Sequence, residues 1–150
     1  MRKLVLTLVV GFFLVSLASA DSGLVSVKSA HDVKTTGDRL EAILKEKGMN
    51  VFIRINHAEG AKKVGKELRP TELLLFGNPN VGTPLMQCAQ SVAIDLPQKA
   101  LIWEDDAGQV WLTYNAPQYL AERHGITECG EVLQKVTNAL SNFAKAATTP

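Results

Sequence analysis

Alternating apolar positions predict two short β-strands in the first part of the chain. Residues 24–29 and 51–56 place apolar side chains at every second position, which is the two-residue period of a half-buried strand. In the second stretch this alternation predicts that Val51, Ile53 and Ile55 point to one side of a sheet.

A continuous apolar run and a pair of turn-linked apolar stretches predict three further strands. Residues 71–76 contain four consecutive apolar side chains at 73–76, which predicts a strand buried on both faces and so central in its sheet. Residues 100–104 and 109–114 flank a polar segment with Gly108, which is typical of a hairpin loop. In that hairpin Trp103 and Trp111 are predicted to be near cross-strand neighbours.

Apolar residues spaced by three and four positions predict the helices. The clearest helix covers residues 128–147, with Thr127 placed to cap its start. Residues 36–47 are predicted to form a second amphipathic helix, capped by Thr35 or Thr36. Shorter helices are predicted over residues 58–68, over a segment capped by Thr83 that ends before residue 90, and over residues 118–124.

The order of these elements indicates the fold class. Strands joined by a tight loop favour an antiparallel sheet, and helices with an apolar stripe need a sheet face to cover. We therefore predict an α+β fold of two layers, with a mostly antiparallel sheet of about five strands and helices packed on it. The last helix is the natural cover for one face of the sheet.

The first 20 residues show the pattern of a secretory signal peptide. Arg2 and Lys3 precede an apolar run over residues 4–17, and small residues at 18–20 suit the cleavage positions. The run is short for a membrane span, so an uncleaved anchor is the less favoured alternative. We expect cleavage after Ala20, a periplasmic or secreted location, and a single mature domain over residues 21–150.

Charge and hydropathy argue against two classes of partner. The chain carries a formal net charge of +1, and removal of Arg2 and Lys3 leaves the mature chain close to neutral. Because no basic stripe is visible, nucleic acid is not expected as a partner. No apolar stretch after residue 20 is long enough to cross a bilayer, so no stable membrane insertion is expected after signal cleavage.

The chain has two cysteines, Cys88 and Cys129. Export places them in an oxidising compartment, where two cysteines usually pair. A redox or metal-thiolate role is the alternative, but it requires a CxxC-like spacing or a neighbouring charge, and neither is present. We therefore predict a structural disulfide between Cys88 and Cys129.

The densest mixture of apolar, glycine, proline and turn residues is 73–87, LLLFGNPNVGTPLMQ. Gly77 and Gly82 have the spacing of a phosphate-binding loop between a strand and a helix. Thr83 and Pro84 stand where that loop needs a lysine and a hydroxyl residue, so nucleotide hydrolysis is not expected. Two interpretations stay open. Backbone N–H groups at the helix start bind a carboxylate or another anion, or the turn only packs strand against helix.

The sequence contains few residues in patterns typical of a metal site or a catalytic site. His57, Met49 and Met86 carry the soft donor atoms that copper accepts, so a periplasmic copper site is one alternative to ordinary packing. No two histidines have metal-ligand spacing, and neither a metal site nor a cofactor is assigned. Ser91 and Ser141 lack the GxSxG context of a nucleophile, so no catalytic residue is assigned and an enzyme of unknown class stays an alternative.

Residues 57–87, HAEGAKKVGKELRPTELLLFGNPNVGTPLMQ, resemble the domain-of-unknown-function 302 family, and the resemblance continues through residues 95–126. It implies a homodimeric α+β domain with TBP-like topology (a β-α-β-β-β-β-α core), and it implies no activity. Ala116 stands where the family often has an aspartate, so no carboxylate role is expected there, and the cysteine pair looks like an addition suited to exported members. The site positions that the resemblance implies are His57, Gly77, Asn78, Pro79, Gly82, Thr83 and Met86.

The sequence thus predicts an exported, homodimeric α+β domain that binds a small molecule or serves as a structural module. The hypothesised site lies where His57 meets the turn between Gly77 and Met86, because both are predicted at strand ends, where ligands often bind. The alternatives are a periplasmic copper-binding protein and an enzyme of unknown class.

Overall fold

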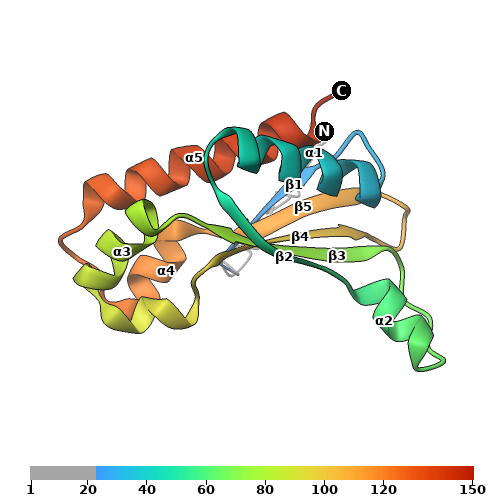
Figure 1. Ribbon diagram of the computed structural model, residues 1–150, viewed down its shortest axis with the longest axis horizontal. Helices are drawn as coiled ribbons and strands as arrows, with labels where there is room; N and C mark the ends of the chain where they lie inside the picture. The colour runs from blue at the N-terminus through green and yellow to red at the C-terminus, as the bar shows by residue number, and fades with distance from the viewer. Residues whose placement is uncertain (1–22) are drawn as a thin grey trace, which may run out of the picture.

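Five strands form one sheet with the order β1-β5-β4-β3-β2 (Figure 1). The computed structural model describes residues 23–150, so the predicted signal peptide lies outside the described residues. Every neighbouring pair of strands is antiparallel. The strands are β1 (Leu24–Lys28), β2 (Asn50–Asn56), β3 (Thr71–Gly77), β4 (Gln98–Glu104) and β5 (Val110–Asn115).

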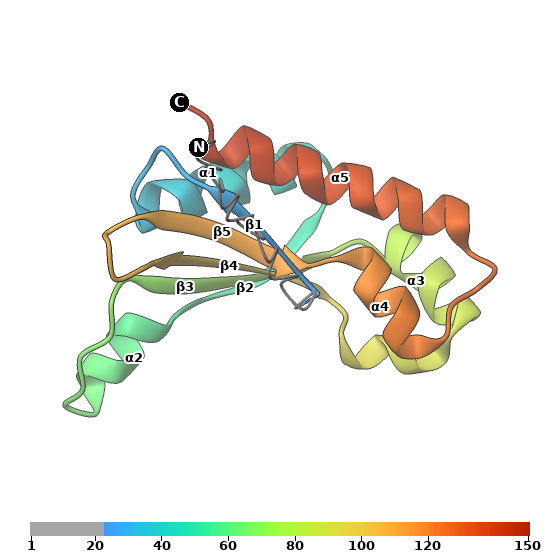
Figure 2. The ribbon, with the colours of Figure 1, turned by 180° about the vertical axis from the view of Figure 1, so that it is seen from behind.

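Helices cover one face of the sheet and gather at both of its ends. They are α1 (Val33–Glu46), α2 (His57–Lys63), α3 (Pro79–Cys88), the 3₁₀ helix η1 (Gln90–Ile94), α4 (Pro117–His124) and α5 (Gly130–Thr148). The helices α1 and α5 lie side by side on the covered face, whereas α2 projects from one end and α3, η1 and α4 lie at the other (Figure 1, Figure 2). This arrangement confirms the predicted two-layer α+β fold.

The hydrophobic core lies between the sheet and its two covering helices. Leu40 and Leu44 of α1 pack in one cluster with Ile102 of β4 and Leu112 of β5, and each of these side chains is 1% exposed or less. Full burial of one such side chain contributes about 1.5–3 kcal/mol. This layer therefore accounts for much of the attachment of the helices to the sheet.

The strand β3 is fully buried on one face only. Leu74 and Phe76 are 0% and 1% exposed, whereas Leu73 and Leu75 are half-buried. β3 also lies beside the edge strand β2, and β4 is closer to the middle of the sheet. The prediction of burial on both faces is therefore wrong, whereas the predicted position inside the sheet is confirmed, because β3 is paired with β4 on one side and β2 on the other. Its apolar run is continuous because the uncovered face of the sheet is apolar as well.

A β-bulge in β2 changes which side chains share a face. Val51 pairs with the buried Phe76, and the register shifts before Ile53, which leaves Phe52 as the extra residue. One extra residue reverses the alternation, so Val51 lies on the helix-covered side and Ile53 and Ile55 lie on the other. The prediction that all three share one face is wrong for this reason.

The face opposite α1 and α5 carries a broad apolar surface, which we call the open apolar face. Within residues 23–150 no helix covers it (Figure 1). Trp103 and Trp111 are direct partners across β4 and β5 on this face, which confirms their predicted proximity. The open apolar face consists of the exposed Ile53 and of six half-buried residues, Ile55, Leu73, Leu75, Leu101, Trp103 and Trp111.

Two helices begin earlier than their predicted caps. Asp32 caps α1, because its Oδ1 accepts a hydrogen bond from the backbone N–H of Thr35 at 2.6 Å, so neither Thr35 nor Thr36 is the cap. Asn78 caps α3, because its Oδ1 accepts from the N–H of Asn80 at 2.9 Å. Short polar side chains at these positions satisfy N–H groups that have no partner inside the helix.

The remaining predicted caps are also displaced. Thr83 and Pro84 lie inside α3 rather than at its start. Cys129 occupies the N-cap position of α5 without a side-chain capping bond, so Thr127 is not the cap. The start of each helix is decided by where the chain leaves the preceding element, and several nearby residues were acceptable caps on sequence grounds.

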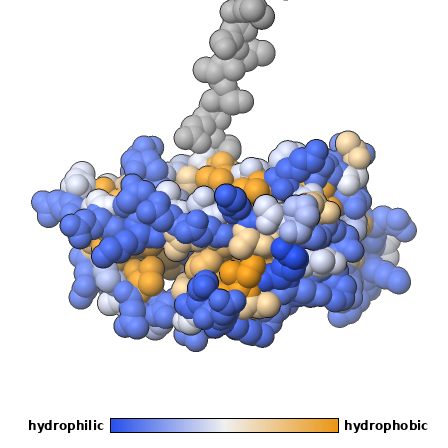
Figure 3. Space-filling view, turned by 90° about the horizontal axis from the view of Figure 1, so that it is seen from above, coloured by the Kyte–Doolittle hydropathy of each residue, from blue (hydrophilic) through white to orange (hydrophobic). Residues whose placement is uncertain are grey.

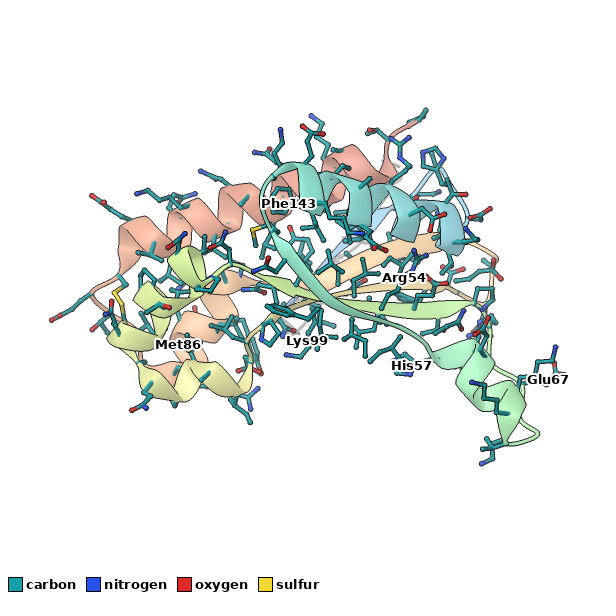
Figure 4. All side chains as sticks on the ribbon, viewed as in Figure 1. Arg54, His57, Glu67, Met86, Lys99 and Phe143 are labelled. Carbon is teal, nitrogen blue, oxygen red and sulfur yellow. A yellow bond between two sulfur atoms is a disulfide. The ribbon has the colours of Figure 1, made fainter. Side chains whose placement is uncertain are left out.

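Arg54 connects β2 to its neighbours β3 and α1 (Figure 4). Its Nε donates to Glu72 Oε2 at 2.7 Å, and its Nη1 donates to Asp38 Oδ1 at 2.6 Å. The guanidinium also lies against Gly37, where an added Cβ would come within 2.5 Å of Nη2. Glycine at position 37 thus gives the arginine room beneath α1.

Candidate functional site

An apolar cavity of about 340 Å³ lies between α3, α5 and the end of the sheet from which β3 leads into α3. Figure 4 labels Met86 on α3 and Phe143 on α5, the two helices beside it, and Figure 3 shows apolar side chains in a recess among hydrophilic ones. This volume accommodates a small organic molecule. The bulky apolar wall includes Phe52, Phe76, Met86, Leu96, Leu140 and Phe143.

Asn78 shapes the turn through which β3 enters α3. Its Nδ2 donates to the carbonyl oxygen of Gly48 at 2.9 Å, while its Oδ1 caps the helix. Pro79 follows as the first residue of α3, a position where a helix needs no N–H. The turn is therefore fastened to the segment between α1 and β2, and this fixes one wall of the cavity.

Gly77 and Gly82 leave space in the cavity wall. A Cβ added to Gly77 would lie 3.5 Å from a carbon atom of both Phe52 and Pro97, and one added to Gly82 would lie 3.7 Å from Leu96. These are ordinary contact distances, and neither glycine has a positive φ. An added Cβ would therefore fit at either position, and it would extend into the wall of the cavity.

All the predicted ligand-binding residues except His57 line this cavity, and these are Gly77, Asn78, Pro79, Gly82, Thr83 and Met86. His57 begins α2 at the opposite end of the β2–β3 pair (Figure 4). Asn56 pairs with Glu72, whereas Asn50 pairs with Gly77. The predicted meeting of His57 with the turn is therefore wrong, because antiparallel pairing sets the end of β2 beside the start of β3.

The cavity offers shape and apolar surface rather than charge. Among the described residues that line it, none has a titratable side chain, and the polar side chains are Asn78, Thr83 and Gln98. Burial of apolar ligand surface contributes about 25 cal/mol per Å². A few polar groups in such a cavity orient the ligand that apolar contact holds.

The structure does not assemble the two other sites suggested by the sequence. Thr83 lies in the middle of α3, so no helix start is available there for an anion, and at the true start the N–H of Asn80 is bonded to Asn78. Met49 and Met86 both line the cavity, but the donor set proposed for copper is incomplete because His57 is not among the lining residues. In residues 23–150 no group of three His, Cys, Asp or Glu side chains is placed to hold a metal ion.

Sequence reasoning missed the walls that come from α5 and from the segment after η1. Val136, Leu140 and Phe143 of α5 line the cavity, as does Leu96. Periodicity identified the α5 residues as an apolar stripe, but periodicity alone cannot separate a side chain packed on the sheet from one that faces a cavity. The apolar stripe of α5 is broad, because it includes Phe143 beside Leu140. This breadth is the signal that could have indicated that α5 faces a cavity as well as the sheet.

Cys88 at the end of α3 and Cys129 at the start of α5 lie at disulfide distance, with Cα atoms 6.5 Å apart (Figure 4). The structure thus confirms the predicted partners. The bond joins the two helices that face the cavity, so it limits how far they can separate.

A single antiparallel sheet, one covering helical layer and a cavity at the sheet end define a class of small α+β domains. The chain belongs to the family described as "Domain of unknown function DUF302", which matches residues 25–143. This confirms the resemblance seen in residues 57–87 and 95–126. The family description assigns no reaction.

A solved structure shows the same fold. It is described as "Crystal structure of uncharacterized conserved protein DUF302 from Bacillus stearothermophilus", and the comparison gives a TM-score of 0.76 over 84% of this chain and 98% of that chain. The sequences are 19% identical. At that identity the similarity establishes the fold alone.

Two named relatives come from Brucella. A protein of Brucella suis biovar 1 (strain 1330) named "Fluoride-specific ion channel FluC 1" is 51% identical over 115 residues, which are 77% of this chain and 45% of that protein. "Fluoride-specific ion channel FluC 2" of Brucella melitensis biotype 1 is also 51% identical, over 43% of its length. The chain thus spans less than half of these relatives. No helix in the described part of the chain is long and apolar enough to cross a membrane.

Proposed function

We propose that this domain binds a small apolar molecule in the cavity between α3 and α5. The supporting observation is the apolar wall of a cavity of about 340 Å³, beside two glycines that leave space in it. Apolar side chains that line a cavity gain free energy when the apolar surface of a ligand is buried against them, so this lining favours an apolar ligand. Binding without catalysis fits best, because the lining has no acid, base or charged nucleophile.

The neutral fluorescent probe N-phenyl-1-naphthylamine tests this function directly. We expect it to bind the mature protein at one site with increased emission, and linear alcohols of increasing chain length to displace it. Ala139 lines the cavity on α5, so Ala139→Phe fills the space and lowers probe affinity by about tenfold or more, equivalent to about 1.4 kcal/mol.

Ala146→Phe is the matched control, because Ala146 lies on the same helix and is exposed. It should retain the affinity of the unmodified protein. Circular dichroism and the melting temperature confirm that both variants are folded. Equal probe affinity in the Ala139→Phe variant and the unmodified protein would exclude this cavity as the binding site.

We further propose that the protein is a homodimer in which the open apolar face meets its copy in a second chain. An isologous contact requires a patch without like charges at its centre. On β4, the charged residue of this face is Lys99, whose Nζ donates to the carbonyl oxygens of Asp95 at 2.9 Å and Pro97 at 3.2 Å, at the end of the strand. The centre around Leu101 and Trp103 is therefore suited to an identical apolar surface.

The dimer proposal is tested by light scattering coupled to size-exclusion chromatography. Leu101→Lys places two like charges at the centre of the face in a dimer, and we expect it to give a monomer. Lys135→Glu, an exposed change on α5, should leave the dimer intact. A monomeric unmodified protein, or an unchanged dimer in the Leu101→Lys variant, would refute this interface.

We also propose that the protein is exported and cleaved after Ala20, as residues 1–20 predict. The disulfide-distance pair Cys88 and Cys129 supports an oxidising location. Intact-mass analysis of protein expressed from the full sequence should show a mature chain that begins at Asp21. A mass that retains residues 1–20 contradicts cleavage.

A role beside a fluoride-specific channel is a second candidate. The observation that favours it is that the region similar to this chain forms part of single polypeptides with that name in Brucella. Deletion of the gene should then lower growth in added fluoride, and expression of the residues 1–150 should restore it. Equal fluoride tolerance of the deletion strain and its parent would reject this role, without affecting the test of the apolar cavity.

A further inference from the structure

A second polar cluster joins η1 to α4, outside the lining of the apolar cavity. Ser91 lies in η1, Asp95 directly follows η1, and His124 is the last residue of α4. The Ser91 Oγ lies 3.0 Å from His124 Nδ1, and His124 Nε2 lies 2.7 Å from Asp95 Oδ2. Figure 2 shows α4 beside the yellow segment that contains η1, which brings together residues from separate parts of the chain.

The hydrogen bonds define one arrangement of protons for a neutral imidazole. An ionised carboxylate only accepts hydrogen bonds, so Asp95 Oδ2 requires that Nε2 of His124 carries the proton. Nδ1 is then an acceptor, and the Ser91 hydroxyl must donate to it. Serine is thus placed to lose its proton to a base that a carboxylate orients, which is the arrangement that activates a serine nucleophile.

His124, Asp95 and Ser91 differ in how far their side chains are buried. The His124 side chain is 7% exposed and that of Asp95 is 13% exposed, whereas Ser91 is exposed. Arg123 Nη1 lies 3.4 Å from the other Asp95 oxygen. The hydrogen bond between His124 and Asp95 is sufficient to attach α4 to the segment that follows η1. A structural role of this kind does not require the exposed Ser91 hydroxyl, which is bonded to the other nitrogen of the His124 ring.

A hollow lies among residues that are close to this cluster in the chain, and Ser91, Asp95 and His124 themselves do not line it. A polar hollow of about 450 Å³ is lined by Gln87, Gly125 and Thr127, among others. Gly125 directly follows His124, and Gln87 lies four residues before Ser91. The Ser91 hydroxyl is exposed, so a small acyl ester can reach it directly from solvent.

We propose that Ser91, His124 and Asp95 form a hydrolytic site for small acyl esters. The Ser91 oxygen attacks the ester carbon while its proton passes to His124 Nδ1, so that a carbon–oxygen bond to serine forms. The bond to the leaving alcohol breaks as the alcohol takes that proton. Water then attacks the acyl-serine with His124 as the base, which releases the carboxylic acid and restores the serine hydroxyl.

The ring nitrogens have exchanged roles relative to the usual serine hydrolase arrangement, in which Nε2 faces the serine. The relay is chemically equivalent, because either nitrogen of imidazole can accept the proton when the other carries one. We expect slow turnover, because positioned proton transfer by itself contributes about 10²–10⁴-fold.

Acylation by p-nitrophenyl acetate provides the test. Intact mass and peptide mapping of the oxidised full-length protein after short exposure should locate one acetyl group on Ser91, with release of p-nitrophenol. Ser91→Ala should abolish this site, and Ser141→Ala, which changes an exposed serine on α5, should retain it. No acetyl group on Ser91, or equal p-nitrophenol release by the Ser91→Ala variant and the unmodified protein, would overturn the proposal.

Asp95 acts as a positioning residue, so its test needs a readout on the ring itself. The amide of Asp95→Asn can donate to Nε2, which favours the tautomer with a proton on Nδ1. We expect the ¹⁵N chemical shifts of His124 to show this exchange and the rate of Ser91 acetylation to fall by about 10²-fold or more. Acetylation at an unchanged rate despite the exchanged tautomer would contradict the relay.

Discussion

The side chain of Asn78 donates a hydrogen bond to the carbonyl oxygen of Gly48 at 2.9 Å, across 30 positions of the chain. The same side chain accepts from the N–H of Asn80 and so caps α3. One asparagine therefore sets both where the helix begins and where its turn is fastened. Because this turn forms one wall of the apolar cavity, the pair connects fold stability to the geometry of the site.

Asn78→Ala should lower both stability and affinity for the apolar probe. Loss of an N-cap side chain costs about 0.5–2 kcal/mol, and the bond to Gly48 is lost as well. We expect urea denaturation to show a free energy of unfolding lower by about 1–3 kcal/mol. Asn80→Ala is the control, because Asn80 uses its backbone N–H in this turn and is exposed. An equal loss in both variants would show that the Asn78 side chain is not the fastening group.

Gly37→Ala should destabilise the protein although alanine is the better helix former. The added Cβ would lie within 2.5 Å of Arg54 Nη2, and the guanidinium is held by Glu72 and Asp38. Displacement of this ion pair and the overlying helix should reduce the free energy of unfolding by about 1–3 kcal/mol. Gly60→Ala, in α2 with nothing near its Cβ position, should raise it by about 0.5–1 kcal/mol. If Gly37→Ala also raised the free energy of unfolding, the proposed clash between the added Cβ and Arg54 would be contradicted.

Acid should destabilise the fold through its hydrogen-bonded carboxylates. Hydrogen bonds from Lys34 and then Arg54 lower the pKa of Asp38 below its ordinary value, and the Trp111 indole N–H lowers the pKa of Asp105. A carboxyl group with a lowered pKa in the folded state contributes stability above its unfolded pKa, near 4, and that stability is lost as the pH falls further. Thermal melts between about pH 6 and 2.5 should show this decline, and Asp105→Asn should make it shallower.

Alkali should destabilise the fold through Tyr114. Burial raises the pKa of this phenol above its ordinary value, because a charged phenolate is poorly solvated there. The unfolded chain then loses its proton first, so stability declines as the pH rises past about 10. We compare the stability of the Tyr114→Phe variant with that of the unmodified protein at pH 7 and above about pH 10. The difference between them should shift in favour of the variant at the higher pH. An unchanged difference would show that Tyr114 does not contribute.

Reduction of the Cys88–Cys129 disulfide should lower the melting temperature. The bond closes a loop with a sequence separation of 41, for which the chain-entropy relation gives about 4 kcal/mol. The Cys88→Ala/Cys129→Ala variant should melt at the lower temperature in both the presence and absence of reductant. If reductant changes neither protein, the cysteines are not bonded in solution.

Much of the fold could be predicted from local patterns. The hairpin around Gly108, with Trp103 opposite Trp111, follows from two apolar stretches and a turn residue in the sequence. The apolar stripe of α5 likewise follows from a period that one element displays by itself. Such features depend on residues close in the chain, so the sequence is sufficient for them.

The register of β2 against β3, and the burial that follows from it, could not be predicted from local patterns. The extra residue Phe52 in β2 is visible only from the pairing with β3, and it separates Val51 from Ile53 and Ile55. A strand without a bulge and a strand with one extra residue both show alternating apolar positions in the sequence. The single inserted residue decides whether Val51 shares a face with Ile53 and Ile55.

By itself the sequence determined the family, the two-layer α+β class, the cysteine pair and the stretch from Gly77 to Met86 as the centre of the candidate site. Only the tertiary structure decided that His57 lies away from that stretch, that α5 completes an apolar cavity, and that Ser91 meets His124. The reason is physical. Helix and strand periods are local, whereas the approach of distant side chains depends on strand direction and helix packing across the whole sheet.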